Sequence, residues 1–401
     1  MTIAAGSVEP VMLDAPFRPH TAEYLADPYG NLARLRALGP CVIDPGTGRW
    51  LLLGAEHVQA GLSQIVRGQA SGPDRHEHFP GNPFAADGPG HTEPRRIVVP
   101  TFTNRSVQQF HASAQAIVDE VLDAKSDGDT IDIVEELGFR LPYTLTCEIL
   151  GVPDVGNRDE LRDWTWKCLQ LFDPFLSEAE LAEYMRAAGA LAGHLGEVLV
   201  WKRDHMGDDL LSTILRASDD GDLLRPEQVP SYVHTLYLAG MHTTVNQISL
   251  TMKAFMDHRD QWDALRAEPS LLENAIEEAL RYEPTAQFMR RATEVETDIC
   301  GVRIPAGTDV ICWIASANRD AQRWGPTADT FDIQRADART HIAFGFGPHV
   351  CIGSWLARLE LQVVVRSLLE RFPNTVMPEQ QLDWVSVVLR GPERLELSLG
   401  R

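Results

Sequence analysis

The sequence predicts a mainly α-helical protein with small β-sheets. Two observations carry this prediction: apolar residues recur at helical spacing over long stretches, and strand-like alternation is confined to short pieces. The 401 residues are 44% hydrophobic, which suffices for a deep core, and no Ser/Gly/Pro-rich linker divides them. We therefore expect one integrated domain over residues 1–401, with residues 1–17 as a flexible N-terminal segment.

The strongest helical signals, in chain order, cover residues 27–38, 107–126, 177–205, 226–258 and 273–282. The third begins with Ser177-Glu178-Ala179-Glu180, the pattern of a capping box. The fourth is long enough to cross a membrane, but two histidines, an asparagine, a glutamine and a lysine interrupt it, which a bilayer core would penalise. It is therefore predicted to be a buried helix in a soluble protein.

Short strands are predicted where the sequence alternates between apolar and polar residues. They cover residues 41–43, 50–54 and 302–314, the last around the turn Pro305-Ala306-Gly307. Residues 385–399 also alternate. Residues 320–341 carry few periodic signals, so we expect an irregular connection there.

Composition narrows the function and the compartment. The net charge of −21 argues against nucleic acid and anionic membranes as partners. Residues 1–17 lack the basic and apolar regions of a signal peptide, and the six cysteines are scattered without CxxC pairs, which suits a reducing compartment. We expect a soluble, cytoplasmic protein.

The most informative segment is residues 344–353, whose sequence Phe-Gly-Phe-Gly-Pro-His-Val-Cys-Ile-Gly reads F-x-x-G-x-x-x-C-x-G. Chance alone should produce this pattern in well under ~1% of chains of this length. Its glycines allow a tight turn that can approach a flat ligand. Cys351 precedes a helix predicted over residues 353–372, whose positive N-terminal end favours a thiolate. Such a sulfur suits the axial ligand of a haem iron.

This segment resembles the cysteine-ligand loop of the cytochrome P450 family, and the similarity extends over nearly the whole chain. The resemblance implies the cytochrome P450 fold, a single large domain that encloses haem b (iron protoporphyrin IX). It also implies that Cys351 ligates the iron, and that Phe344 and Gly353 belong to the cofactor-binding loop.

A second motif lies at the centre of the long buried helix. Residues 239–244, Ala-Gly-Met-His-Thr-Thr, are similar to the family's oxygen-binding stretch A-G-x-[acid]-T-T, which implies catalytic roles for Ala239, Gly240, His242 and Thr243. A glycine inside a helix costs about 1 kcal/mol relative to alanine, so Gly240 needs a reason, either close approach of a ligand or a crossing with another helix. The Thr243 hydroxyl can bond to a backbone carbonyl or turn toward bound oxygen.

His242 departs from the family pattern, because most members carry an aspartate or glutamate there that takes part in proton delivery. An imidazole titrates near neutrality and can relay protons. It can also slow proton delivery and so favour removal of two hydrogen atoms without oxygen insertion, or it can hold the substrate. A histidine that the helix merely tolerates is a fourth interpretation, and spacing does not choose among them.

Charged residues extend the resemblance. Glu278-Ala279-Leu280-Arg281 matches the family's E-x-x-R, which we interpret as a structural ion pair. Its third charged partner is expected downstream, at either Arg323 or Arg335.

Another segment resembles the family's D-x-P-x-H-x-x-x-R, which implies that His91 and Arg95 meet the haem propionates. They stand four residues apart and therefore share a helix face. Arg290 and His349 are further candidates by their positions. Pro94 is expected in the first turn of this helix, where proline is tolerated.

By family position, the substrate pocket is expected to draw on residues 64–84, 164–175, 285–289 and 387–390 and on the helix near His234 and Tyr237. Its apolar lining is expected from Phe84, Trp166, Phe172, Phe288 and Met289. Its polar anchors are expected among Gln64, Arg67, Gln69, Gln287 and Arg390.

The resemblance implies a bacterial-type haem-thiolate oxidoreductase that activates O₂ to oxidise a small, secondary-metabolite substrate, by default through hydroxylation. No flavin or ferredoxin domain is visible in the chain, so electrons are expected from a ferredoxin and an NAD(P)H-dependent ferredoxin reductase; a monomer is expected. The alternative is oxidative C–C or C–N coupling of an aromatic natural product such as a cyclic dipeptide, and a more remote one is a non-catalytic haem sensor. Substrate, regiochemistry and the particular ferredoxin are not readable from the residues.

Overall fold

The computed structural model describes residues 9–65, 86–153, 158–173, 176–221 and 223–401, and helices dominate them. The α-helices are α1 (Ala22–Ala26), α2 (Pro28–Leu38), α3 (Ala55–Gln64), α4 (Pro89–Val98), α5 (Asn104–Val107), α6 (His111–Asp123), α7 (Arg140–Leu150), α8 (Arg158–Gln170), α9 (Glu178–Asp204), α10 (Leu210–Asp220), α11 (Val229–Gly240), α12 (His242–Asp257), α13 (Arg259–Ala267), α14 (Leu272–Tyr282), α15 (Ile314–Ala317), α16 (Ala321–Trp324) and α17 (Ser354–Arg371). Shorter 3₁₀ turns are η1 (Val99–Phe102), η2 (Gln108–Phe110), η4 (Pro226–Gln228), η5 (Pro269–Leu271), η6 (Ala338–Thr340) and η7 (Gly347–His349), and η3 (Ile133–Phe139) is a π-helix.

The strands are short and form three sheets. They are β1 (Val11–Met12), β2 (Cys41–Ile43), β3 (Trp50–Leu52), β4 (Thr130–Asp132), β5 (Met289–Ala292), β6 (Thr297–Ile299), β7 (Val302–Ile304), β8 (Asp309–Cys312) and β9 (Glu396–Ser398). The largest sheet has the order β1-β2-β3-β8-β5, while β4 pairs with β9 and β6 with β7.

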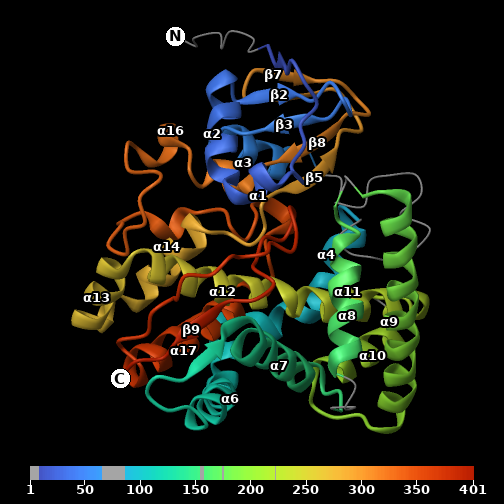
Figure 1. Ribbon diagram of the computed structural model, residues 1–401. Helices are drawn as coiled ribbons and strands as arrows, with labels where there is room; N and C mark the ends of the chain where they lie inside the picture. The colour runs from blue at the N-terminus through green and yellow to red at the C-terminus, as the bar shows by residue number, and fades with distance from the viewer. Residues whose placement is uncertain (1–8, 66–85, 154–157, 174–175, 222) are drawn as a thin grey trace.

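The five-stranded sheet joins the two ends of the sequence. β3 runs parallel to β8, with Leu51 opposite Ile311, and β5 runs antiparallel to β8. Figure 1 shows this sheet with α1, α2 and α3 at one end of the molecule and the larger helical part at the other. Strands from the second half of the chain therefore complete a sheet that the first 60 residues begin.

The mainly helical prediction is confirmed. The helices α2, α9, α14 and α17 begin and end within one residue of their predicted limits. At the start of α9 both hydrogen bonds of the capping box are present: Oγ of Ser177 accepts from the backbone N–H of Glu180, and the Glu180 carboxylate accepts from the backbone N–H of Ser177. Local start signals therefore located this helix correctly.

Two predicted helices are interrupted. Residues 107–126 divide into the last residue of α5, the 3₁₀ turn η2 and the longer helix α6. Residues 226–258 divide into η4, α11 and α12, with the break at Met241. Among the strands, β1, β4, β5 and β6 were not predicted, since two to four residues are too few for alternation to be visible.

The helix α12 crosses the core, as Figure 1 shows, and two buried amide side chains on it have hydrogen-bond partners. Nδ2 of Asn246 donates to the carbonyl of Leu389 at 3.0 Å, and Nε2 of Gln247 donates to the carbonyl of Glu283 at 3.0 Å. These bonds compensate the cost of burying the two amides. Over the residues that the structure covers, none of the helices combines the length and apolar character needed to span a membrane.

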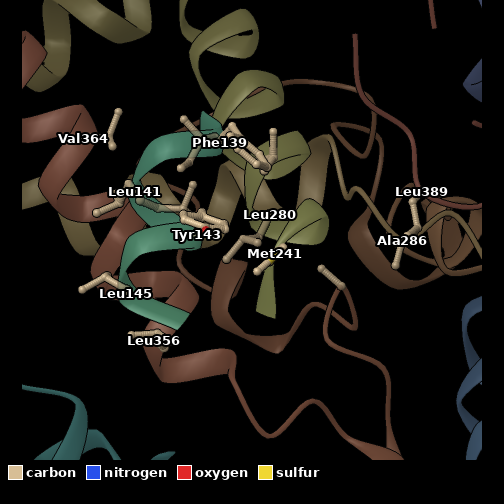
Figure 2. Packing of buried hydrophobic residues seen from close by; sticks show 14 of the residues in the cluster. Phe139, Leu141, Tyr143, Leu145, Met241, Leu280, Ala286, Leu356, Val364 and Leu389 are labelled. Atoms are coloured by element: carbon tan, nitrogen blue, oxygen red, sulfur yellow. The ribbon is translucent and has the colours of Figure 1, made fainter. Parts of the chain in front are cut away.

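One hydrophobic cluster packs around this crossing. It gathers side chains from η3, α7, α14 and α17 and from the break at Met241, as Figure 2 shows. Removing a large apolar side chain from such a core costs roughly 2–5 kcal/mol. The break in the long helix therefore lies inside this hydrophobic cluster.

The E-x-x-R pair is fully buried and fixes α14 to the chain that precedes Cys351. Nε and Nη2 of Arg281 donate to the two carboxylate oxygens of Glu278, at 2.7 Å and 2.8 Å. Nε of Arg335 donates to the same carboxylate at 3.2 Å, whereas Arg323 pairs with Asp337 nearer the surface. Arg335 is therefore the third charged partner.

Candidate active site

Cys351 lies in a closed loop immediately before α17. Its backbone N–H donates to the carbonyl of Phe344 at 2.9 Å, which joins the two ends of the predicted motif. Its side chain is exposed. The loop therefore presents the sulfur while the backbone on either side is held by hydrogen bonds.

Glycine is required at Gly347 by both conformation and space. Its φ is +78°, in the left-handed region that favours glycine. A Cβ added there would lie 2.9 Å from Cα of Ser63 in α3. The cysteine loop therefore packs backbone to backbone against α3, and no side chain fits between them.

The electrostatic environment of Cys351 is balanced between opposing effects. Although the side chain is exposed, desolvation by the protein packed around it raises the pKa of the thiol, while the backbone N–H of Gly353 and the charges of Arg95 and Arg358 lower it. The net effect is a raised pKa of the Cys351 thiol, so the expectation that the end of α17 favours a thiolate stays a prediction. A metal ion favours deprotonation because it binds the thiolate and not the thiol.

The motif of residues 239–244, which the resemblance implied to be an oxygen-binding stretch, coincides with the break between α11 and α12. Met241 has φ −100° and ψ −91°, outside the helical region, and the backbone N–H groups of Thr244 and Val245 both donate to its carbonyl. Oγ1 of Thr243 donates to the carbonyl of Ala239 at 3.1 Å across this break. Ala239 is exposed and Thr243 is half-buried, although most residues around them are buried. These two residues therefore present a small side chain and a hydroxyl on one accessible side of the helix.

Gly240 approaches another helix. A Cβ added to Gly240 would lie 2.7 Å from Oγ1 of Thr146 in α7. Of the two reasons considered for this glycine, the structure shows the helix crossing. The close contact with α7 explains why the helix accepts the propensity cost of about 1 kcal/mol.

His242 points toward α8. Its side chain is buried, and Nε2 lies 2.9 Å from Oγ1 of Thr165 and 3.3 Å from the carbonyl oxygen of Arg162. Burial lowers the pKa of His242 to about 4; the hydrogen bond with the Arg162 carbonyl acts in the opposite direction, and the Arg162 charge adds to the lowering. The ring is therefore neutral near pH 7.

Two of the expected propionate partners lie together beside the cysteine loop. The rings of His91 and His349 stack with centroids 4.0 Å apart, and Nε2 of His349 lies 2.8 Å from the Asp87 carboxylate. Arg95 donates from Nη2 to the carbonyl of Val350, next to Cys351. Burial and the charges of His349 and Arg95 lower the pKa of His91 to about 4.

The arginine at this cluster is Arg291, whereas Arg290 was predicted. Nε of Arg290 donates to the Asp309 carboxylate at 2.7 Å, an ion pair that Asp309 shares with Arg49. Arg291, its neighbour on β5, is 2% exposed, and its charge lowers the pKa of His349. Successive residues of a strand point to opposite faces, so only one of two adjacent arginines can face the cluster. The sequence does not distinguish the two arginines, and the assignment of either to a propionate stays a prediction.

Pro94 is placed differently from the prediction. It is the sixth residue of α4 and so lies inside the helix, beyond the first turn. A proline at that position leaves an earlier carbonyl of the helix without its usual donor. The carbonyl of Pro94 itself accepts from the hydroxyl of Tyr232 in α11 at 2.6 Å, which ties the two helices together.

The predicted substrate contacts have mixed outcomes. Residues 66–85, which include Arg67, Gln69 and Phe84, lie outside the described chain. Arg390 packs over the Trp384 ring at 3.3 Å and Nη1 donates to the carbonyl of Leu25, whereas its buried Nε has no partner among the described residues. Phe288 is buried against Trp313, with ring centroids 4.6 Å apart. Both are therefore parts of the packed interior.

Glu360 in α17 is a buried titratable residue near the motif of residues 239–244 that the sequence analysis did not identify. It is 1% exposed, its Oε1 has no hydrogen-bond partner among the described residues, and it interacts with Thr244, the residue after Thr243. Burial raises the pKa of this carboxyl group to about 8, against a weaker lowering by the bond to Thr244. A polar residue within an apolar helical stripe was the only sequence signal.

Comparison with known proteins identifies the family of this site. A family model described as Cytochrome P450 matches residues 67–398. The cytochrome P450 monooxygenase PikC of Streptomyces venezuelae is 38% identical over 94% of this chain and 92% of its own length. The 6-deoxyerythronolide B hydroxylase of Saccharopolyspora erythraea is 32% identical over 93% of this chain and 96% of its own length. Among solved structures, CxnD, a cytochrome P450 described as acting in C–S bond formation in chuangxinmycin biosynthesis, superposes with a TM-score of 0.86 at 29% identity, covering 97% of this chain and 99% of that one.

Proposed function

The chain belongs to the cytochrome P450 family and is a P450 monooxygenase, and on that premise we propose that it holds haem b through Cys351 and hydroxylates a small secondary metabolite. The observation that carries this proposal is the position of the polar cluster. Arg95 contacts the carbonyl of Val350 beside the cysteine, and His91 and His349 stack nearby. An iron ligand with basic groups close beside it is what a haem with two propionates requires.

The residues present fit this cofactor. Nε of Arg291 is buried and has no acceptor among the described residues, which supports a role in pairing with a carboxylate supplied by the cofactor. Phe344 and Gly353 complete the loop around Cys351: the Phe344 carbonyl closes it, and at Gly353 an added Cβ would lie 4.0 Å from the sulfur. We assign Arg291 to the propionates together with His91, Arg95 and His349, in place of Arg290.

A thiolate-ligated haem supplies the electron density that favours O–O cleavage. Residues of α11 and the start of α12 would shape the space on the oxygen-binding side of this haem. Ala239 keeps the accessible side of α11 free of bulk, and the Thr243 hydroxyl, held by the Ala239 carbonyl, is the group that can reorient to donate a proton toward oxygen. Gly240 allows α11 to pack closely on α7 and so maintains the site indirectly.

The remaining requirements concern electrons and organisation. We propose a single haem-thiolate domain over residues 1–401 that acts as a monomer in the cytoplasm. Of the segment expected to be flexible, residues 1–8 lie outside the described residues, whereas Val11–Met12 form β1 and pair with β2. Electrons would come from NAD(P)H through a ferredoxin reductase and a ferredoxin, and O₂ is the second substrate. The net charge of −21 supports the absence of nucleic acid and anionic membranes among its partners.

The names of the relatives support hydroxylation and leave one rival. The 6-deoxyerythronolide B hydroxylase shares 32% of its aligned residues with this chain. CxnD, described as acting in C–S bond formation, shares 29% and the same fold. Bond formation between parts of an aromatic natural product, for example C–C or C–N coupling of a cyclic dipeptide, is therefore the second candidate reaction. Membership of a monooxygenase family disfavours a non-catalytic haem sensor.

The test combines a spectrum with a product mass. The purified, haem-loaded protein should show a thiolate-ligated haem spectrum, and Cys351→Ala should abolish that signature while Cys312→Ala, at a buried cysteine of β8, keeps it. Metabolites that shift the Soret band are then incubated with a ferredoxin, its reductase and NADPH. A product heavier by one oxygen supports hydroxylation, whereas loss of two hydrogens identifies coupling. A wild-type protein that never shows the thiolate spectrum refutes the assignment of Cys351.

A further inference from the structure

The buried tie between α12 and α8 involves a single ring nitrogen and two oxygen atoms. Nε2 of His242 lies 2.9 Å from Oγ1 of Thr165 and 3.3 Å from the carbonyl oxygen of Arg162. Both partners belong to α8, one turn of helix apart, whereas His242 is the first residue of α12. The contact therefore connects the break in the long helix to a different helix of the fold.

The chemistry of the partners determines which atom carries the proton. A carbonyl oxygen only accepts, so the bond to Arg162 requires a hydrogen on Nε2 of His242. The Thr165 hydroxyl has one proton, and its nearest acceptor is the Leu161 carbonyl at 2.7 Å. Its oxygen is therefore free to accept from His242. The ring is the Nε2–H tautomer and donates to α8, and a neutral imidazole is sufficient for this bond.

The surroundings disfavour a proton on the second ring nitrogen. The rings of Phe139 and Trp166 flank His242, with centroids 6.2 Å and 5.7 Å away. The charged groups on this side are Arg162, whose guanidinium lies 5.2 Å above the Phe139 ring, and Glu135, with which Arg162 forms an ion pair. The nearer charge is thus positive and the environment aromatic, so an imidazolium would be destabilised.

We propose that His242 is a positioning residue: its Nε2–H ties the first turn of α12 to α8 and thereby holds the break at Met241 and the Thr243 hydroxyl in place. The inference rests on the proposed function and selects among the four interpretations of this histidine. It assigns His242 neither to proton relay nor to substrate binding. The family's acidic residue is replaced here by a neutral hydrogen-bond donor that works through structure.

The tie also offers a route from substrate to the oxygen-binding stretch. Trp166 lies on α8, within the segment expected to contact substrate. Thr165 of the same helix forms the hydrogen bond with His242 of α12. A displacement of α8 therefore acts on the start of α12 through the hydrogen bond to Thr165. Thr243 follows His242 directly, so its hydroxyl is the functional group nearest to that attachment point.

The test is a double-mutant cycle with a non-catalytic readout. Hydrogen–deuterium exchange of the haem-loaded protein is followed by mass spectrometry in peptides that cover residues 158–170 and 239–250. The variants are His242→Ala, Thr165→Val, the double variant, and His242→Gln, which keeps a donor at similar reach but does not titrate. The matched control is Thr213→Val, because Oγ1 of Thr213 in α10 donates to the carbonyl of Asp209, the N-cap residue of the same helix, and so ties no second helix.

A hydrogen bond of this kind shifts an opening equilibrium by about two- to tenfold. His242→Ala and Thr165→Val should each raise exchange in both peptides by such a factor, the double variant should add nothing further, and Thr213→Val should leave both at wild-type values. His242→Gln should lie close to wild type. Peroxide released per NADPH consumed, with a ferredoxin and its reductase, should follow the same order, because a displaced Thr243 hydroxyl delivers protons less effectively.

Two results overturn the proposal. In the first, Thr165→Val leaves hydrogen–deuterium exchange unchanged while His242→Ala raises it, so the contact with Thr165 does not hold α12. In the second, His242→Gln releases as much peroxide as His242→Ala, which indicates that His242 relays protons. If His242→Ala loses haem, Thr165→Val and His242→Gln still decide between tie and relay. A protein without a thiolate spectrum refutes the proposed function alone, because the exchange cycle can be measured whatever the spectrum shows.

Discussion

Replacing Gly240 with alanine would place a methyl carbon 2.7 Å from Oγ1 and 3.4 Å from Cγ2 of Thr146. Thr146 is 6% exposed and branched at Cβ, so it cannot move aside without disturbing its neighbours. Alanine gains about 1 kcal/mol of helix propensity over glycine. An extra methyl group in a packed core costs roughly 1–3 kcal/mol. We expect Gly240→Ala to lower the free energy of unfolding by about 1 kcal/mol net.

The clash itself is isolated by a double-mutant cycle with Thr146→Ala, measured by urea unfolding of the haem-loaded protein. Thr146→Ala removes both atoms that the new methyl group meets, so the double variant should be more stable than the sum of the single changes by roughly 1–3 kcal/mol. Gly193→Ala in α9 is the matched control. Among the described residues, no atom lies within 4 Å of a Cβ added at Gly193, so this substitution should raise stability by up to about 1 kcal/mol.

The contrary result is also informative. If Gly240→Ala stabilises the protein as much as Gly193→Ala does, and Thr146→Ala shows no coupling with it, the packing explanation fails. The glycine would then be explained by approach of a ligand to the oxygen-binding stretch. In that case Gly240→Ala should change the haem spectrum or the product yield while leaving the free energy of unfolding unaffected.

Three further predictions concern Glu277 in α14, the two arginines of β5 and Gly347 in the cysteine loop. Burial raises the pKa of the Glu277 carboxyl in α14, but hydrogen bonds from His341 and Arg358 outweigh this and lower the pKa to about 2 from the usual 4.5. Ionised Glu277 therefore stabilises the fold by about 3 kcal/mol above pH 4.5, and this contribution is lost as the pH falls toward 2. Urea unfolding should show Glu277→Gln less stable by that amount at pH 7, with the difference shrinking below pH 4.5; a constant difference would contradict the lowered pKa. Arg291→Gln should weaken haem retention ~10-fold or more, measured by transfer to apomyoglobin, because a charge-assisted bond contributes about 1.5–3 kcal/mol. Arg290→Gln is its control and should retain haem like wild type; the reverse order would restore Arg290 as the propionate partner. Gly347→Ala should lower the melting temperature. An alanine in the left-handed conformation destabilises the fold by roughly 1–2 kcal/mol, and its methyl carbon would lie 2.9 Å from Cα of Ser63. An unchanged melting temperature would show that the loop can relax.

Features that depend on neighbouring residues were predictable from sequence. The capping box located the start of α9, and apolar periodicity located α14 and α17 within one residue. The spacing around Cys351 predicted a loop followed by a helix, which the structure shows. These predictions succeed because capping, periodicity and glycine conformation act over a few residues of the chain.

Features that depend on contacts between residues far apart in the sequence were not predictable from the sequence. Arg335 and Arg323 are equivalent in sequence, and only the fold brings Arg335 to within 3.2 Å of the Glu278 carboxylate. Arg290 and Arg291 are adjacent, and the pairing of β5 with β8 decides which of them faces His349.

The oxygen-binding stretch shows the same division. The sequence by itself determined that this chain carries a cysteine loop, a glycine–threonine stretch and a histidine in place of an acid. Only the tertiary structure decided what two of these residues contact, since Gly240 meets Thr146 of α7 and His242 meets Thr165 of α8. Side-chain identity is a local property, whereas the partner of a buried side chain depends on how helices far apart in sequence pack, and packing is settled by the whole core at once.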